Sequence, residues 1–213
     1  MACEESGRVT SCLRRLGIEA YSCDILPTRG NPEWHIQRDV TELLKEPWDA
    51  ILAFPPCTHI ATSGASWFKE KRKDGRQQEG IDFFMKFVTY AESHPFCLMA
   101  IENPVGIMSS IYRKPDQIIQ PYQFGEDASK KTCLWLFNLP LLKPTKYVPP
   151  SWYYEGKPRW SNQCKGGQDR QGQHKNRGRD RSVTYQGVAD AMASQWFHAH
   201  RKTLAQDLED QKT

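Results

Sequence analysis

Apolar and polar positions alternate in blocks along the first 142 residues of the chain. Four short apolar runs predict β-strands at residues 18–25, 48–54, 96–101 and 132–137. Before the third run, Ile81, Phe84, Met85 and Val88 share one helical face and predict a helix over 77–92. Another helix is predicted over 9–16. Strands that alternate with helices favour a layered α/β fold with a largely parallel sheet.

Residues 143–181 follow a different pattern. They hold ten Lys and Arg against three Asp and Glu, begin with aromatic residues and show no periodicity. This composition predicts a long loop or a poorly ordered insertion. After it, Val188, Met192 and Trp196 recur every four residues and predict a helix over 187–205. We therefore expect one domain built from residues 1–142 and 182–205, with an insertion at 143–181.

Length and charge narrow the class of protein only slightly. The chain has 213 residues, which is the length of one domain with a modest insertion. Its formal net charge of +4 permits an anionic partner without requiring one. The apolar runs are all shorter than ten residues, so we expect no membrane-spanning helix. The first residues lack the basic and apolar prelude of a secretory signal.

The seven cysteines are widely spaced, odd in number and without a C-x-x-C pair. This usage fits a reducing cytoplasm better than a disulfide framework. Cys164 and His174 lie in one segment, but two ligands are too few for a structural zinc site. We therefore expect no metal.

Cys57 is the first candidate for chemistry. It follows an apolar strand and the pair Pro55-Pro56, which stiffens the turn that presents the thiol. A cysteine at the carboxyl end of a strand is suited to act as a nucleophile. The alternative interpretation is a small apolar residue that fills a gap in the core.

Glu102 is the second candidate, because it ends the next predicted strand and is followed by Asn103-Pro104. Partial burial raises the pKa of a carboxyl group and makes it a plausible proton donor. Alternatively, Glu102 is a carboxylate near the N-terminus of a following helix. The carboxyl ends of parallel strands meet at one sheet edge, so Cys57 and Glu102 are expected to form a nucleophile and acid pair.

A turn that could approach a ligand is indicated near the N-terminus. In Cys3-Glu4-Glu5-Ser6-Gly7, the glycine before a helix allows a ligand to approach the backbone closely. Asp24, at the end of the next predicted strand, is suited to bind ribose hydroxyls. Asp39 is suited to accept a hydrogen bond from an adenine amino group. The alternative for both acids is a helix cap or a solvated turn.

Taken together, these residues resemble the cytosine carbon-5 DNA methyltransferases, in particular their short, phage-encoded type. The resemblance covers about residues 2–142 and 182–197. It is carried by residues 4–7, Asp24, Asp39, Pro55-Pro56-Cys57, Glu102-Asn103-Pro104 and residues 187–192.

The resemblance implies a class I methyltransferase fold, which is a Rossmann-like three-layer sandwich, here without a large target-recognition domain. It implies S-adenosylmethionine as the cofactor, attack of Cys57 on cytosine carbon 6, and a proton from Glu102 at N3, with Asn103 holding the loop. Lys130 and Lys131 stand where the family commonly uses arginines to reach the base. The implied cofactor-binding residues are Glu4, Ser6, Gly7, Asp24, Ile25, Asp39, Val40, Pro55 and Gly187.

The implied partner is duplex DNA with a flipped cytosine, contacted by the basic segments 67–80 and 143–181. For the first of these, the resemblance implies a loop that closes over the target base, with Gly64 and Gly75 suited to act as hinges; the alternative is a mobile surface loop without a function. We expect a monomer in the cytoplasm of a bacterium or a phage-infected host. Two alternatives stay open: an RNA cytosine methyltransferase, and a nucleic-acid-binding protein without turnover on a degenerate methyltransferase scaffold.

Overall fold

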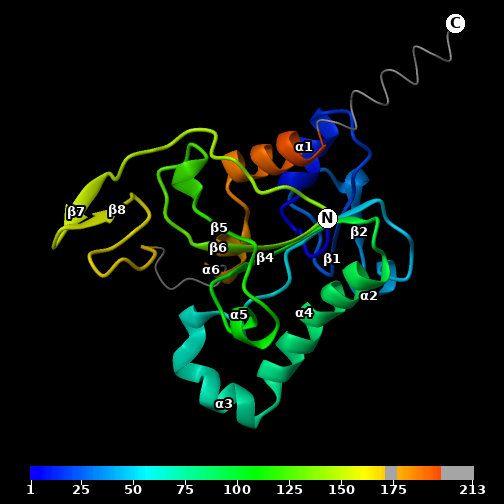
Figure 1. Ribbon diagram of the computed structural model, residues 1–213, viewed down its shortest axis with the longest axis horizontal. Helices are drawn as coiled ribbons and strands as arrows, with labels where there is room; N and C mark the ends of the chain where they lie inside the picture. Colours follow the sequence, from blue (N-terminus) through cyan, green and yellow to red (C-terminus); the bar gives the residue numbers. More distant parts are fainter. Residues whose placement is uncertain (171–176, 198–213) are drawn as a thin grey trace, which may run out of the picture. The chain divides into compact units, whose positions relative to one another are not determined.

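A computed structural model describes residues 1–170 and 177–197 and divides the chain into two compact units (Figure 1). The first unit consists of Met1–Glu5, Tyr21–Ile119 and Lys131–Leu141. The second consists of Ser6–Ala20, Gln120–Lys130 and the chain from Leu142 onward. The predicted domain of residues 1–142 and 182–205 is shared between these units, and the predicted insertion falls wholly in the second. Both helices and strands are present, so the α/β prediction is confirmed.

The first unit contains one sheet in which a single short segment at Ala2 joins two groups of strands. Ala2 forms parallel bridges to Cys23 on one side and to Ala53 on the other. The order across the sheet is therefore β2, β1, the Ala2 segment, β3, β4, β6 and β5. The strands are β1 (Ser22–Asp24), β2 (His35–Gln37), β3 (Ala50–Ala53), β4 (Leu98–Pro104), β5 (Gln117–Ile119) and β6 (Thr132–Phe137).

The sheet is mixed. β1 pairs with β2 and β3 pairs with β4 in parallel, whereas β6 runs antiparallel to both β4 and β5. The four predicted strands are all present, with ends that differ by a few residues. β2 and β5 were not predicted, because three residues are too few to show a period of two.

The Ala2 segment is bonded on both sides. The Ala2 N–H donates to the Leu52 carbonyl at 2.8 Å, and the Phe54 N–H donates to the Ala2 carbonyl at 2.9 Å. On the other side, the Glu4 N–H donates to the Cys23 carbonyl at 3.1 Å. After the Ala2 segment, the chain first adds β1 and β2 on one side and then adds β3 and β4 on the other, so the strand order reverses at this segment. In open α/β sheets, ligands bind outside the carboxyl ends of the strands where the strand order reverses in this way.

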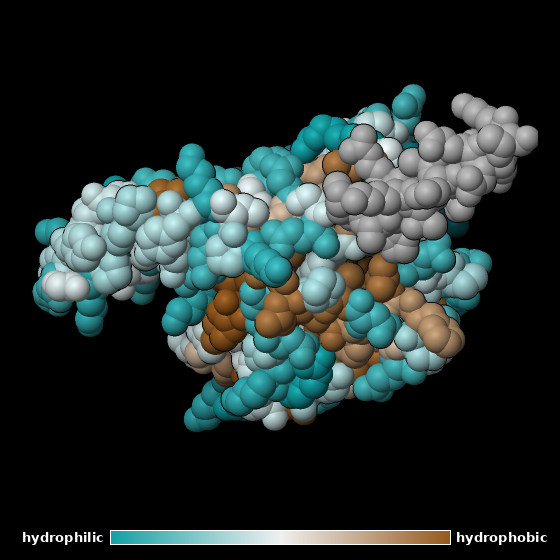
Figure 2. Space-filling model, turned by 45° about the horizontal axis from the view of Figure 1, so that its top comes forward, coloured by the Kyte–Doolittle hydropathy of each residue, from teal (hydrophilic) through white to brown (hydrophobic). Residues whose placement is uncertain are grey.

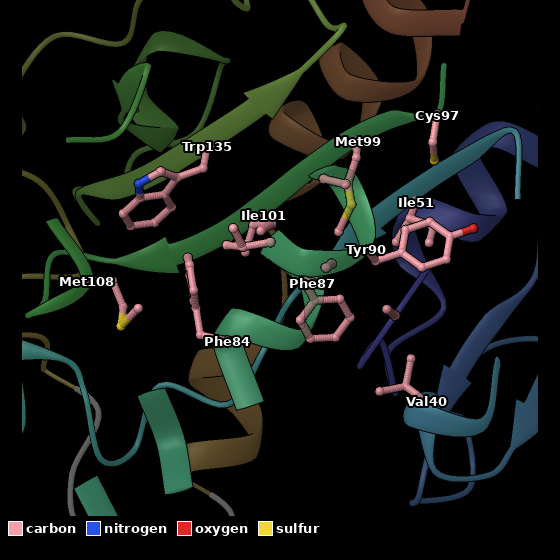
Figure 3. Close-up of a cluster of buried hydrophobic side chains, with 14 of the residues drawn as sticks. Val40, Ile51, Phe84, Phe87, Tyr90, Cys97, Met99, Ile101, Met108 and Trp135 are labelled. Atoms are coloured by element: carbon pink, nitrogen blue, oxygen red, sulfur yellow. The ribbon is translucent and has the colours of Figure 1, made fainter. Parts of the chain in front are cut away.

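Helix α4 (Arg76–Ser93) packs on one face of this sheet and closes the core (Figure 3). Phe84, Phe87 and Val88 on the helix are fully buried, as are Met99 and Ile101 on β4. Burial of each such side chain contributes about 1.5–3 kcal/mol relative to exposure. The predicted helix over 77–92 is confirmed. The first unit also contains η1 (Pro32–Trp34), α2 (Val40–Leu43), η2 (Thr62–Trp67), α3 (Phe68–Lys73) and α5 (Met108–Ile111).

The second unit is built around two helices. Asp190, in the helix over 186–197, accepts hydrogen bonds from the Cys12 thiol at 3.1 Å and the Arg15 guanidinium at 3.0 Å on the other helix. Residues 198–205 of the predicted C-terminal helix lie outside the described residues. The unit contains α1 (Arg8–Arg15), η3 (Pro121–Gln123), β7 (Trp152–Tyr154), β8 (Lys157–Arg159) and α6 (Arg177–Ser182).

The prediction of a long loop or poorly ordered insertion at 143–181 holds for most of the described part of that segment but is wrong at two places, the strands β7 and β8 and the helix α6. β7 and β8 form an antiparallel hairpin. Its two turn residues, Glu155 and Gly156, have φ of 48° and 70°, the positive values that a tight hairpin turn requires. Strands of three residues show no periodicity in a sequence, which explains the error. In the described part of the chain, no helix has both the length and the apolar character needed to cross a bilayer.

Candidate active site

The two predicted catalytic motifs are joined by a direct hydrogen bond. The Asn103 side-chain amide, which is buried, donates to the Pro55 carbonyl at 2.8 Å. β3 and β4 are parallel, and Ala53 opposite Ile101 is their last pair. Cys57 follows the carboxyl end of β3, and Glu102 lies within β4, directly after that last pair. Both residues are half-buried. The bond therefore fixes the turn that carries Cys57 to the strand that carries Glu102.

A second set of hydrogen bonds ties together the two segments that follow the motifs. The Thr62 N–H and hydroxyl both donate to the Val105 carbonyl, at 2.9 and 2.8 Å. The Ile107 N–H donates to the Ile60 carbonyl at 2.9 Å. Between these bonds lies Gly106, where an added Cβ would be only 2.4 Å from the Ile60 oxygen. Glycine at position 106 is therefore what allows the two backbones to approach this closely.

Lys71 also contacts the turn that follows Cys57. Its side chain is buried, and the ammonium group donates to the Thr58 carbonyl at 2.6 Å. The ammonium lies against Gly64, whose added Cβ would be 3.3 Å from Nζ. A buried ammonium is costly without partners, so this hydrogen bond is a built feature of the turn after Cys57. Sequence analysis missed Lys71, because a lysine within a basic run normally faces solvent.

The prediction that residues 67–80 form a loop is wrong, since the segment forms α3 and the start of α4. Gly75 has φ 88° and is the N-cap of α4, in the short turn between α3 and α4. Arg76 is engaged by the carboxylates of Glu70 and Asp74, which leaves Lys69, Arg72 and Lys73 as the exposed cations of the segment.

Two buried polar atoms near this turn lack a hydrogen-bond partner within the described residues. They are Nδ1 of His59 and Nε2 of Gln77, and Gln77 is 5% exposed. His59 packs on α4, since a Cβ added at Gly80, one helical turn beyond Gln77, would be 3.3 Å from the His59 Cβ. Unsatisfied buried groups are rare and require an explanation, such as a ligand that completes them.

Replacing Lys71 with methionine is expected to loosen the turn after Cys57. The substitution keeps the apolar stem but removes the hydrogen bond to the Thr58 carbonyl, and a hydrogen bond from a charged donor contributes about 1.5–3 kcal/mol. Chemical denaturation measures the loss of stability, and iodoacetamide labelling measures the exposure of the Cys57 thiol. Lys73→Met, an exposed lysine two residues later in the same helix, is the control. Equal effects of the two substitutions would contradict the role of Lys71.

The residues predicted to bind the adenosine part of a cofactor gather at the same edge of the sheet. β1 and β2 are parallel, and the Arg38 N–H donates to the Asp24 carbonyl at 3.1 Å, so the segments carrying Asp24 and Asp39 lie side by side. Cys3 adopts a left-handed conformation with φ 59°, a strained value for a residue with a side chain. Glu4 is buried, and Ile25 is 71% exposed.

Asp24 and Asp39 also make the contacts expected if they were a turn residue and a helix cap. Asp24 accepts the Leu26 N–H at 2.9 Å in a turn, and its other oxygen accepts no hydrogen bond from the described residues. Asp39 caps α2 by accepting the Thr41 N–H at 2.8 Å, and hydrogen bonds from Thr41 hold the pKa of the Asp39 carboxyl below its usual range. Val40 is buried in the apolar core (Figure 3).

Four predicted residues belong to the second unit. Gly7 has φ 62° and precedes α1, after the half-buried Ser6. The Gly187 N–H donates to the Glu126 carboxylate at 3.0 Å, and a Cβ there would be 1.8 Å from the Phe124 oxygen, so this glycine is required for packing. The Lys130 ammonium donates to the Arg181 carbonyl at 2.9 Å. Lys131 belongs to the first unit, where it is exposed and precedes Thr132, the partner of Pro104 in the sheet.

The cysteines differ in environment. All seven are free thiols. Burial raises the pKa of five of them, which keeps these thiols neutral and disfavours them as nucleophiles: Cys3, Cys12, Cys23, Cys97 and Cys133. His174, which the sequence places in one segment with Cys164, lies outside the described residues.

One edge of the sheet therefore carries Cys57, Glu102 and Asn103, and also, on the other side of the Ala2 segment, Asp24 and Asp39. No protein-family model, curated protein or solved structure matches this chain. Its function is accordingly inferred from the residues and their geometry.

Proposed function

We propose that this protein transfers a methyl group from S-adenosylmethionine to carbon 5 of cytosine in DNA, through a covalent adduct with Cys57. The hydrogen bond between Asn103 and Pro55 carries the proposal, because it fastens a half-buried thiol and a half-buried carboxyl to one edge of the sheet. A nucleophile and a proton donor held together in this way suit addition to an electron-poor ring.

The strand order supports a Rossmann-like class I methyltransferase fold. Counted along the chain from the Ala2 segment, the first five strands lie in the order third, second, first, fourth, fifth. This is the order of doubly wound nucleotide-binding sheets, in which the ligand crevice lies beside the first and fourth strands. Those are the Ala2 segment, which leads into Glu4, and β3, which leads into Cys57.

The residues at the reversal fit an adenosyl cofactor. Asp24 has a carboxylate oxygen that accepts no hydrogen bond from the described residues, which suits ribose hydroxyls, and the neighbouring Ile25 offers an exposed apolar surface for a base. Asp39 stands at the end of the adjacent strand. When bound, the cofactor supplies an electrophilic methyl group on a sulfonium. Asp24, Ile25 and Asp39 would hold its nucleoside end.

The protein's own groups prepare the base. The Cys57 thiolate attacks carbon 6 of cytosine, so that an S–C bond forms and the C5=C6 π pair moves toward carbon 5 and N3. Glu102 gives a proton to N3 and neutralises the charge that develops there. Asn103 holds the Pro-Pro turn at the required position. After substitution at carbon 5, loss of the carbon 5 proton returns the electron pair to the ring and expels the Cys57 thiolate.

Covalent trapping tests the proposal. Duplex DNA containing 5-fluorocytosine, incubated with the protein and S-adenosylmethionine, is expected to form an adduct that survives denaturing electrophoresis, because fluorine cannot leave as a proton. A cofactor-free readout is the exchange of tritium from carbon 5 of cytosine, which requires attack at carbon 6. The same sequence as structured RNA separates the RNA alternative. DNA binding without adduct and without exchange would refute the proposal and favour the non-catalytic scaffold.

Replacing Glu102 with glutamine is expected to slow both methyl transfer and tritium exchange at least about tenfold, since an amide cannot protonate N3. Single-turnover rates measure this effect without a contribution from product release. Glu92→Gln, an exposed carboxylate on α4, is the matched control. A Glu102→Gln protein with unchanged rates would remove this carboxyl from the mechanism.

A further inference from the structure

Residues 25–30 of the first unit form a loop that begins directly after Asp24, at the end of β1. Its apolar side chains Ile25 and Leu26 are 71% and 43% exposed. Exposed apolar side chains also occur elsewhere on the surface, as the brown areas of Figure 2 show, so exposure alone would not distinguish this loop. The loop is distinguished by its main chain, which is bonded at both ends while these side chains face solvent.

Two side chains of β2 hold the start of the 25–30 loop. The Gln37 side-chain amide donates to the Ile25 carbonyl at 3.2 Å. The His35 ring donates from Nε2 to the Leu26 carbonyl at 2.9 Å, and its Nδ1 lies 2.8 Å from the hydroxyl of the buried Ser22. Because a carbonyl only accepts, Nε2 carries the proton in this arrangement. The imidazole is therefore held on both sides, and it fixes Leu26 to β1 and β2.

The end of the 25–30 loop is fastened to Glu5, which follows Glu4 in the N-terminal turn. The Glu5 carbonyl accepts the Thr28 hydroxyl at 2.9 Å and the Arg29 N–H at 3.0 Å. The Arg29 guanidinium also pairs with the Glu5 carboxylate, with Nε 2.9 Å from Oε1. The Glu5 side chain is only 7% exposed. A carboxylate buried this deeply is costly without partners, so the pair is a built contact between the loop and the turn.

The bonds at both ends lie beside residues to which the proposed function gives the cofactor, since the loop follows Asp24 and its far end is fixed next to Glu4. The side chains of residues 25–27 are exposed, so packing in the core gives no reason for so many bonds. A wall that is set in place before a ligand arrives does give one, because the ligand then loses less free energy in ordering its site.

We infer that the 25–30 loop is a preformed clamp for the nucleoside end of S-adenosylmethionine, and that Arg29 and His35 are positioning residues that hold it. The inference rests on the proposed function for its choice of ligand. Arg29 acts through Glu5 and the main chain of the loop, and His35 acts through the Leu26 carbonyl. Neither residue is required to contact the reacting atoms.

Calorimetric titration of the full chain with S-adenosylhomocysteine, without DNA, tests the clamp. Arg29→Met removes the pair with Glu5 and is expected to raise Kd at least about tenfold, since the ligand would have to order the loop itself. His35→Leu removes the bond to the Leu26 carbonyl and is expected to weaken binding in the same way. In turnover, both substitutions are expected to raise KM for S-adenosylmethionine with kcat nearly unchanged.

A merely structural role would give a different set of results. Cofactor-free exchange of tritium from cytosine carbon 5 is expected to be normal in Arg29→Met, and a parallel loss of exchange would assign Arg29 to general stability and contradict the clamp. Arg29→Lys, which keeps the charge, is expected to recover part of the affinity. Combining Arg29→Met with Glu5→Gln is expected to weaken binding no further than the more severe single change, because both remove one contact. Arg113→Met, the control, breaks the ion pair with Asp116 elsewhere in the first unit and is expected to keep Kd.

Hydrogen exchange of the unmodified protein gives a measurement that does not depend on any variant folding. The amides of Leu26, Arg29 and Gly30 donate to the Asp24 carboxylate, the Glu5 carbonyl and the Thr28 hydroxyl, so they are expected to exchange slowly before any ligand is added. Exchange as fast as in an unfolded peptide, slowed only by S-adenosylhomocysteine, would show that the clamp is not preformed.

The titration also separates this inference from the proposed function. Equal affinities of the unmodified protein, Arg29→Met and Arg113→Met for S-adenosylhomocysteine would overturn the clamp and leave the proposed function standing. An unmodified protein that bound no S-adenosylhomocysteine and formed no adduct with 5-fluorocytosine DNA would refute the proposed function, and the clamp with it.

Discussion

Replacing Cys57 with serine is expected to abolish the adduct with 5-fluorocytosine DNA and to slow methyl transfer by at least about a thousandfold. A serine hydroxyl stays protonated under conditions in which a thiol ionises, so it is a much weaker nucleophile. The change is nearly isosteric, so the turn held by Asn103 and Lys71 is expected to stay in place. Denaturing electrophoresis after trapping measures the adduct, and single-turnover kinetics measures the rate.

The matched control is Cys164→Ser, which makes the same chemical change at another half-buried thiol. It is expected to keep both adduct and turnover. DNA affinity of the Cys57→Ser protein is expected to equal that of the unmodified protein, since binding does not depend on the covalent step. An adduct that persists without Cys57 would assign the nucleophile to another residue and remove the basis of the proposed mechanism.

The neighbourhood of Cys57 and Glu102 in the fold could be predicted from the sequence because it depends on the apolar runs that mark two neighbouring strands. The strands at 48–54 and 96–101 were visible in the apolar pattern, and the carboxyl ends of parallel strands meet at one edge. That rule brings Cys57 and Glu102 together without any knowledge of side-chain contacts. The bond from Asn103 to the Pro55 carbonyl adds what the pattern cannot supply, since it depends on the register of β3 against β4.

The residues that hold the turn could not be predicted, because their roles arise from neighbours distant in sequence. Lys71 is buried only because Thr58 offers a carbonyl and Gly64 offers space. Nothing in the run of lysines and arginines around it marks this one as different. The hairpin within 143–181 was missed for a related reason, since its strands are short and the residues at its two ends are held by hydrogen bonds to Asp127.

Replacing Gly106 with alanine is expected to separate the two backbones that frame the site. The new Cβ would be 2.4 Å from the Ile60 carbonyl oxygen, and both atoms are fixed to main chain that cannot rotate away. The same oxygen accepts the Ile107 N–H, so the shift also breaks a hydrogen bond at Ile60, which is fully buried. Overpacking costs about 1–3 kcal/mol and a broken buried hydrogen bond about 1–3 kcal/mol.

The two costs add to about 2–6 kcal/mol, so the Gly106→Ala protein is expected to melt about 4–24 °C lower, at roughly 2–4 °C per kcal/mol for a chain of this size. Below its melting temperature, it is expected to form the trapped adduct more slowly than the unmodified protein, because the Cys57 turn no longer abuts the segment after Glu102. Gly166→Ala is the control, since its added Cβ would meet only the Cys164 sulfur at 3.9 Å. Normal stability and normal adduct formation in Gly106→Ala would show that the close approach of these two segments does not hold the site, and the geometry on which the mechanism depends would have to be built another way.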